Sequence, residues 1–318
     1  MSLLIRPLRI TDIDSLTDIA AISFAAEYEA RGQTAASFSQ QIRMVTRGRM
    51  IPFRLFTRLA GYKWAIFVAE VDGRIVGCGG YIGRKQVELA NLMVHPDYRR
   101  QGIGRALLQK RLTYLAEAGY PYVTTTVLTT NTASLGNLSQ QGFTPFDTYT
   151  ILQKPLASTE NHKWSDASLL SRQLTPTDKS IFTQIEAELT PPDLLAQQGS
   201  KVEGYFLSSG QRLLNRLTGS RFWARAFIHK GETVGFLAGR TATGQTSGMV
   251  GRPIVRDAHL HHLPAMLHEA ETWLLQEDKK KVQLSLPVSR AHVGEELLHQ
   301  YGWTETYTWV RLIKKLSA

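Results

Sequence analysis

The chain has 318 residues, of which 43% are hydrophobic and 20% are charged, and this balance is typical of a globular protein rather than a disordered or fibrous one. At roughly 150 residues per domain, the length predicts two domains. Cys78 is the only cysteine, which excludes an intramolecular disulfide and argues against a cysteine-based zinc site. No apolar run approaches the ~20 residues that span a bilayer, and the start of the chain carries Asp12 and Asp14 in place of a signal-peptide core. We therefore expect a cytoplasmic protein without a transmembrane segment.

The formal net charge of +10 is unevenly distributed. Residues 1–157 contain 18 Lys and Arg against 11 Asp and Glu, whereas the remainder contains 19 against 16. A basic excess is typical of proteins that bind nucleic acid, an anionic membrane or a phosphate-rich cofactor. No nucleic-acid-binding module is recognised in the chain, so we expect no specific nucleic-acid partner.

The two halves of the chain resemble each other. Three pairs of segments match in the same order at offsets of 158 to 166: 3–12 with 169–178, 64–77 with 222–235, and 142–154 with 302–314. The first pair predicts a strand followed by a helix that begins at Thr-Asp, and the second predicts a hairpin with a glycine turn. The alternative is chance similarity between generic strand–helix segments. We expect two tandem mixed α/β domains, 1–156 and 165–318, each with a mainly antiparallel twisted sheet flanked by helices and joined through a polar linker.

The stretch from Val87 to Leu108 carries the most chemical information. It begins as an apolar strand that Pro96 stops, because proline cannot donate to a ladder. A helix then begins near Gly102, and its free backbone N–H groups and dipole favour an anion. Gly102 and Gly104 leave room for a diphosphate, and the nearby arginines Arg99, Arg100 and Arg105 add cationic donors. These features predict a phosphate cradle that is neither of the Rossmann nor of the Walker type.

The string from Val94 to Gly104 resembles the acetyl-CoA signature of the GNAT superfamily of N-acetyltransferases. A second resemblance follows, because Asn131, Ser134, Leu138, Gly142 and Phe143 match another spaced motif of that family. The resemblance covers residues 3–154 in order. The resemblance implies that main-chain groups of Leu92, Met93 and Val94 pair with pantetheine and that Asn131 bonds the cofactor near its reactive end. It further implies that the pyrophosphate of acetyl-CoA is held by the cradle residues Arg99, Arg100, Gln101, Gly102, Ile103, Gly104 and Arg105.

The resemblance also implies acetyl transfer to a primary amine of a small molecule or peptide. Such an amine is mostly protonated at neutral pH and needs a base. Glu88 is the candidate, because several family members place a catalytic glutamate on this strand; the alternative is a solvated edge glutamate. Glu88 and Val94 share a face unless a bulge intervenes. The family often protonates the leaving thiolate with a tyrosine seven residues after the asparagine, where this chain has Leu138, so Tyr149 or water would have to substitute. A non-catalytic acyl-CoA sensor or scaffold is therefore the alternative function.

The second copy lacks the cradle. Its equivalent segment, Ala258–Leu263, has no glycine and precedes Pro264, and Ala291 stands where Asn131 stood. We expect this degenerate domain to be structural or to wall a substrate cleft. Its histidines, His259, His261, His262 and His268, predict a solvated helix start rather than a metal site, and we assign no metal ligands.

A basic segment in the first half interleaves Arg43, Arg47, Arg49, Arg54 and Arg58 with apolar residues. In the family this region lines the acceptor site, so an anionic acceptor or a membrane surface is one interpretation. Ordinary amphipathic helices with a basic outer face are the other. The sequence identifies neither the acceptor nor the oligomeric state, and a homodimer stays open.

Overall fold

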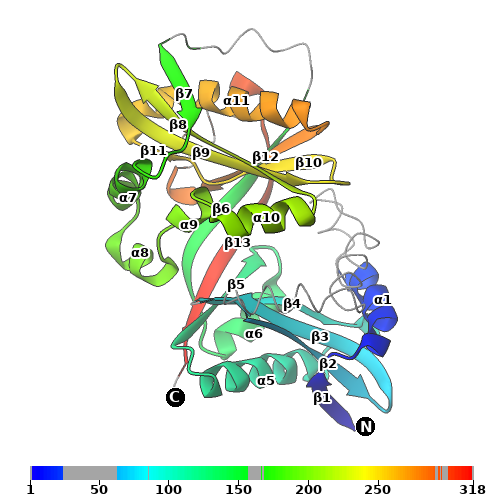
Figure 1. Cartoon of the computed structure of the whole chain (residues 1–318). Coiled ribbons are helices and arrows are strands. Elements are labelled where there is room, and N and C mark those ends of the chain that lie inside the picture. Colours follow the sequence, from blue (N-terminus) through cyan, green and yellow to red (C-terminus); the bar gives the residue numbers. More distant parts are fainter. Residues whose placement is uncertain are drawn as a thin grey trace. The chain divides into compact units, whose positions relative to one another are not determined.

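The computed structural model describes residues 2–23, 63–84, 86–156, 166, 168–290, 293, 295 and 300–316. The chain forms two compact units (Figure 1). Unit 1 contains residues 1–146 and 310–318, and unit 2 contains residues 147–309. Each is a mixed α/β structure in which helices pack against a mainly antiparallel sheet, so the predicted fold class is confirmed.

The sheet of unit 1 has the strand order β1-β2-β3-β4-β5-β13. Its strands are β1 (Leu3–Pro7), β2 (Lys63–Val71), β3 (Arg74–Gly83), β4 (Val87–Val94), β5 (Tyr122–Leu128) and the second part of β13 (Thr304–Lys315). The pairs β1–β2, β2–β3 and β3–β4 are antiparallel, and β4–β5 is parallel. A parallel pair needs a crossover connection, which the intervening helix supplies.

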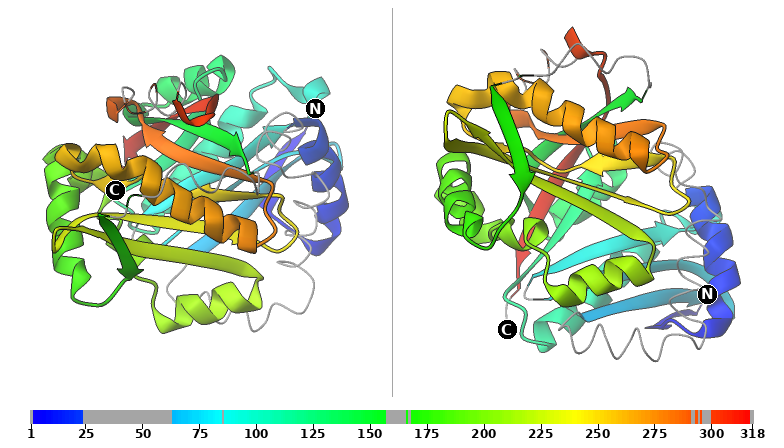
Figure 2. Two further views of the ribbon diagram at one scale, coloured as in Figure 1. Left: turned by 90° about the horizontal axis from the view of Figure 1, so that it is seen from above. Right: turned by 45° about the horizontal axis from the view of Figure 1, so that its top comes forward.

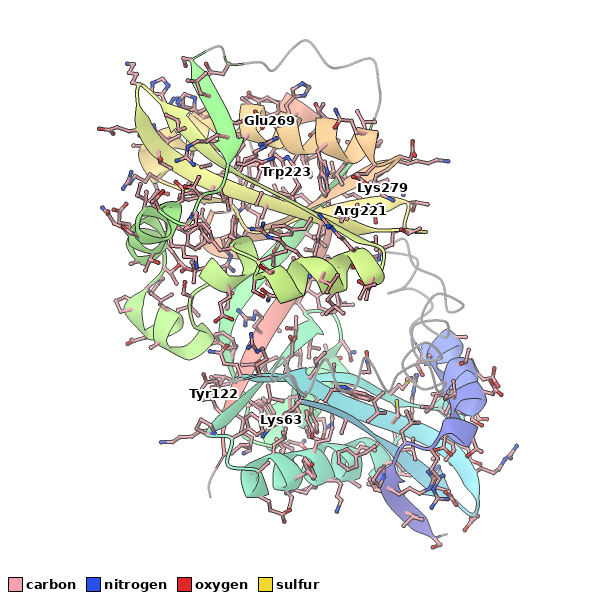
Figure 3. All side chains as sticks on the ribbon, in the orientation of Figure 1. Lys63, Tyr122, Arg221, Trp223, Glu269 and Lys279 are labelled. Atoms are coloured by element: carbon pink, nitrogen blue, oxygen red, sulfur yellow. The ribbon has the colours of Figure 1, made fainter. Side chains whose placement is uncertain are left out.

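Helices cover both faces of this sheet. One face carries α5 (Ile103–Glu117) and α6 (Thr132–Gln140), and the other carries α1 (Ile13–Ser23), which follows η1 (Ile10–Asp12). The α5 face is the larger core, in which Leu107, Leu108 and Leu115 are fully buried. Figure 3 shows the side chains that fill the layer between β2–β4 and α5. This two-sided burial explains the nearly continuous apolar sequence of β3 and β4.

Unit 2 repeats the plan with the order β6-β12-β10-β9-β8-β7, and β11 also pairs with β9. Its strands are β6 (Thr144–Pro155), β7 (Leu169–Gln173), β8 (Ser220–His229), β9 (Glu232–Ala242), β10 (Ser247–Val250), β11 (Ile254–Val255) and β12 (Lys281–Pro287). Here too one pair is parallel, β10 with β12, and the others are antiparallel.

The helices of unit 2 also occupy both faces of its sheet. α11 (Leu263–Gln276) lies across one face and follows η3 (Asp257–His262) (Figure 2). The other face carries α7 (Asp178–Leu189) and α9 (Val202–Tyr205). Two further helices, α8 (Pro192–Gln198) and α10 (Ser209–Leu217), and the short η4 (Val288–Arg290) complete the elements of this unit, while η2 (Pro96–Tyr98) belongs to unit 1.

The same hydrogen bonds open the first strand–helix unit in both halves. Arg6 forms a fork with Asp12, with Nη–O distances of 2.7 and 2.9 Å, and Arg172 does the same with Asp178 at 2.7 and 2.6 Å. Each aspartate also accepts a backbone N–H three residues before it at 2.7 Å. Each aspartate thereby links the start of its helical segment to the preceding turn and to the strand that carries the arginine. The duplication seen in the sequence is thus present at the level of individual side-chain contacts.

The two hairpins match as closely. The turns Asp72-Gly73 and Lys230-Gly231 both have positive φ at both positions, as a two-residue type I′ turn requires. Each hairpin has a register shift at the equivalent place, after Ala69 and after Phe227.

The compact units do not follow the predicted division at residues 156 and 165. Residues 147–155 of β6 pair with β12 inside unit 2, and residues 310–315 of β13 lie in unit 1, where Val310, Leu312 and Leu316 are part of the core. Each half of the sequence therefore contributes its last strand to the other unit. Among the helices of the described ranges, none is long and apolar enough to cross a membrane.

Candidate functional site

In unit 1, β4 and β5 pair along only part of their length and then diverge. Their parallel pairing is limited to Val87–Leu89 with Val123–Thr125, although both strands continue. From Ala90 onwards the β4 backbone keeps only β3 as its ladder partner. Unpaired strand edges are sites at which an extended ligand can add hydrogen bonds. The predicted pantetheine-pairing residues Leu92, Met93 and Val94 lie in this divergent part.

A bulge in β4 decides which side chains share a face. The register with β3 shifts between Cys78 and Gly80, and Asn91 has φ of 54°. Leu89, Leu92 and Val94 all pack on the α5 face, whereas Met93 packs on the α1 face. Glu88 precedes the bulge and alternates with Leu89, so it points to the α1 face, opposite Val94. The bulge allowed for in the sequence analysis is present, and it reverses the simple alternation.

The start of α5 has the geometry of an anion cradle. Gly102 caps the helix with φ of 80°, a conformation that favours glycine, and makes no side-chain capping hydrogen bond. A Cβ on Gly102 would meet no atom within 4 Å, and one on Gly104 would meet only Val94 Cγ2, at 3.8 Å. Ile103, between the two glycines, is buried. The first N–H groups of the helix can therefore receive an anion through the opening above the glycines.

The polar side chains of the cradle are exposed and partly anchored. Arg99 Nε donates to Val94 O at 3.1 Å, and Gln101 Nε2 donates to Asp97 O at 3.2 Å. Arg100 has φ of 60°, and Arg105 lies exposed on the first turn of α5. The predicted cradle residues therefore come together around one helix start, with three cationic side chains at its rim.

Asn131 has a structural task at the start of α6. Its Oδ1 accepts the Ser134 N–H at 3.1 Å, which makes it the N-cap of the helix. Asparagine is among the preferred residues at this position. The Oδ1 atom of Asn131 is therefore engaged at the start of α6, and its Nδ2 group is the donor that would contact a ligand.

Glu88 is exposed, and Thr126 Oγ1 donates to its Oε1 at 2.9 Å. The partner comes from β5, at the place where the two strands begin to diverge. The threonine orients the carboxylate through Oε1. The other oxygen, Oε2, is then the one that would accept a proton or contact a ligand. This position, where the two strands diverge, fits a base, and the exposure of the carboxylate fits the solvated-edge alternative.

Leu138 cannot act on a leaving group. It is 3% exposed and lies in the α5-side core. The position at which the family often has a tyrosine is thus filled by packing. Tyr149, the predicted substitute, lies in the part of β6 that pairs with β12 in unit 2.

The sequence analysis missed Arg111. Its side chain is 1% exposed, and the guanidinium donates to Leu107 O at 3.2 Å, Gly80 O at 3.0 Å and Ala90 O at 3.4 Å. Burial lowers the pKa of Arg111 to about 10, so it remains charged at neutral pH. A signal was present in the sequence: Arg111 falls between Leu108 and Leu112 on the apolar face of the helix.

The equivalent region of unit 2 is built differently. The helix α11 follows η3 instead of a glycine turn, and Pro264 occupies its first turn. The prediction of a solvated helix start is wrong for His262, which is 3% exposed and whose Nδ1 lies 2.7 Å from Asp166 Oδ2. Its ring lies 4.6 Å from that of His229 and 3.9 Å from that of His261. Tertiary contacts bury this histidine because β8 and residue 166 pack over the start of α11.

Within the described ranges no group of His, Cys, Asp and Glu is arranged to hold a metal ion. The arginine-rich segment with Arg43, Arg47, Arg49, Arg54 and Arg58 lies outside the described residues, as does Ala291.

The chain is similar to known acetyltransferases. Residues 38–143 match the model of the acetyltransferase (GNAT) family. An acetyltransferase of Yersinia pestis (strain Pestoides F) is 34% identical over 95 residues, which are 29% of this chain and 67% of that protein. An acetyltransferase of Pectobacterium atrosepticum is 36% identical over 86 residues, 26% of this chain and 60% of that protein. The chain therefore belongs to the GNAT family of acetyltransferases.

Solved structures extend the likeness to the whole chain. A tandem GNAT protein from the clavulanic acid biosynthesis pathway has a TM-score of 0.64 at 17% identity and covers 100% of this chain and 99% of its own. A GCN5-related N-acetyltransferase from Sphaerobacter thermophilus has a TM-score of 0.66, also at 17% identity, over 99% of this chain and 96% of its own. At this identity the likeness shows the fold: two GNAT-type units in one chain.

Proposed function

We propose that the protein is an acetyl-CoA-dependent N-acetyltransferase with one active site per chain, located in unit 1. The observation that carries this proposal is the continuous path from the divergent part of β4 to the glycine-capped start of α5. An extended thiol arm can follow the strand edge, and a diphosphate can reach the free N–H groups of the helix. In unit 2 the helix η3 continues directly into α11, with Pro264 in the first turn, so the glycine-capped helix start has no counterpart among the described residues there.

In this proposal each predicted residue has a distinct task. Leu92, Met93 and Val94 pair with the pantetheine arm through their backbones. The pyrophosphate rests on the N–H groups of the segment from Gln101 to Arg105, and Arg99, Arg100 and Arg105 neutralise its charge. Asn131 offers its Nδ2 group to the cofactor near the thioester.

The reaction forms a C–N bond and breaks the C–S bond of acetyl-CoA. The amine nitrogen attacks the thioester carbonyl, and its proton passes to Glu88 directly or through one water. The departing sulfur leaves as a thiolate, which takes a proton from solvent. The acceptor is a primary amine of a small molecule or peptide, which the base must deprotonate because an alkylammonium has a pKa near 10.4.

A sensor or scaffold that binds acyl-CoA without turnover is the second candidate, and burial of Leu138 favours it. Without a tyrosine, the site lacks the general acid that family members often use, and such an acid is typically worth about 10²–10⁴-fold. A thiol with an ordinary pKa near 8.5 is nevertheless a tolerable leaving group.

A thiol-release assay across a panel of amines, combined with calorimetric titration of acetyl-CoA, separates the two. We expect one binding site per chain and acetyl-CoA consumption stimulated by one class of amine. Tight binding without stimulated turnover would favour the sensor, and the absence of binding would reject both.

A further inference from the structure

Arg111 is a buried cation without a counter-charge. It is among the largest fully buried side chains, and among the residues that the structure describes it forms no ion pair. The titratable group that influences it is Cys78, whose thiol pKa burial raises to about 12, so that neighbour is neutral. Burying a charge is energetically costly unless the charge is paired with an opposite charge and hydrogen-bonded.

The guanidinium lies directly behind the β4 bulge. Nη1 donates to Gly80 O and Ala90 O, which belong to register partners on the two strands at the point where the ladder shifts. Cys78 Sγ donates to Asn91 O at 3.6 Å on the other side of the bulge. Peptide oxygens at the bulge thus accept hydrogen bonds from side chains on both faces of the sheet.

The sheet makes room for this charge. A Cβ on Gly79 would lie 2.9 Å from Arg111 Cζ and 3.0 Å from Nε, so glycine at this position allows the guanidinium to lie against β3. A donor to Ala90 O also polarises the peptide that joins Ala90 to Asn91 and strengthens its N–H as a donor. The positive charge and the polarised peptide both lie where β4 has separated from β5.

We propose that Arg111 is a positioning residue that acts through the bulge to stabilise the thiolate of coenzyme A as it departs, in place of a general acid. The proposal rests on the function proposed above. When the C–S bond breaks, the electron pair remains on sulfur, and a fixed positive charge behind the strand lowers the energy of that anion. Solvent then supplies the proton. A chain with Leu138 in the tyrosine position thus retains a means to release the thiol.

The test measures the thiol pKa of coenzyme A bound to the full chain. Coenzyme A labelled with ¹³C at the carbon next to sulfur is titrated by NMR, alone and in the complex. Cys78 does not interfere, because its pKa is raised to about 12. We expect the bound thiol to have a pKa about one unit below that of free coenzyme A. Arg111→Lys should keep most of this shift, whereas Arg111→Met should abolish it and lower kcat about tenfold.

A matched control separates charge from packing. Leu112 is 4% exposed on the same helix, and Leu112→Ala removes core volume without changing charge. It should lower stability while the bound thiol pKa stays at the value of the parent protein. A shift that survives in Arg111→Met, or is lost equally in Leu112→Ala, would overturn the proposal. A parent protein that binds coenzyme A with an unshifted thiol pKa would overturn it and leave the proposed function intact, whereas no binding at all would overturn both.

Discussion

The two units share the contacts that begin their folds and differ where we propose the site of unit 1. The Nη1–Oδ2 distance is 2.7 Å in both the Arg6–Asp12 and the Arg172–Asp178 pair, and the two hairpin turns have positive φ at the same positions. In unit 1, β4 is continuous through its bulge. In unit 2, the equivalent strand is divided into β10 and β11. Duplication has therefore preserved the local interactions that set the frame, whereas the strand that would receive a cofactor has changed.

The break in unit 2 is filled by its own side chains. Tyr205 Oη donates to Arg252 O at 2.8 Å, and the Arg252 guanidinium pairs with Asp147 at 2.8 Å, where both side chains are largely buried. The backbone carbonyl between β10 and β11 therefore has a partner within the protein. The difference teaches that a divided strand in a GNAT-type sheet can be stabilised by hydrogen bonds from side chains of the same unit.

The sharpest way to break the comparison is a charge in the cradle of unit 1. Gly102→Glu should lower the affinity for coenzyme A by about 10²-fold or more, because a carboxylate faces the diphosphate. Calorimetric titration measures the effect. Gly102→Ala is the matched control for the strained φ, and it should cost far less affinity than the glutamate. His261→Glu places the same charge at the exposed counterpart in unit 2 and should leave binding unchanged; an equal loss there would show that the site is not confined to unit 1.

The next largest effect concerns Glu88. Glu88→Gln should lower kcat/KM by about 10²–10⁴-fold with nearly unchanged affinity for acetyl-CoA, because the amide keeps the shape and loses the basicity. The loss should shrink as pH approaches the pKa of the amine. Thr126→Val removes only the hydrogen bond at 2.9 Å and should have a smaller effect. A glutamine variant within a few-fold of the parent at every pH would identify Glu88 as an edge residue.

The shared helix starts provide a smaller effect that should be equal in the two units. Asp12→Ala and Asp178→Ala should each lower the free energy of unfolding by about 1–3 kcal/mol, since each leaves a backbone N–H and an arginine without their acceptor. Hydrogen exchange can report the loss separately for each unit. The Arg172 hydrogen bond lowers the pKa of Asp178 to about 2 from 3.8, so its contribution is complete above pH 3.8 and is lost as pH falls from 3.8 towards 2. If one variant lowered the hydrogen-exchange protection of both units, the two helix starts would not stabilise their units separately.

The smallest expected effect is a pH dependence of stability that arises from one histidine of unit 2, His259. Burial lowers the pKa of His259, and the neighbouring His262, His261 and His229 lower it further. The unfolded chain therefore binds this proton more readily, so stability should decline as pH falls below 6.5. Thermal unfolding between pH 7.5 and 5.5 measures the slope. His259→Gln should flatten it, and the control His268→Gln should not; a slope that persists in His259→Gln would assign it to another group.

Much of the frame could be predicted from sequence because it depends on residues close in the chain. The duplication, the two glycine turns, the end of β4 before Pro96 and the start of α5 at Gly102 all follow from local patterns. A turn with positive φ selects glycine, and a helix start selects residues that leave its N–H groups accessible. Such requirements act within a few residues, so a single sequence reveals them.

What only the tertiary structure decided involves residues far apart. The exchange of β6 and β13 between the units depends on strand pairing over more than a hundred residues, which local patterns do not encode. The bulge at Asn91 reverses the face of Glu88 relative to Val94, because one extra residue shifts a period of two. The contacts that bury Arg111 become apparent only when α5 is placed against the β4 bulge. There, carbonyls from two different strands accept hydrogen bonds from its guanidinium, and the surrounding packing buries its charge behind the proposed site.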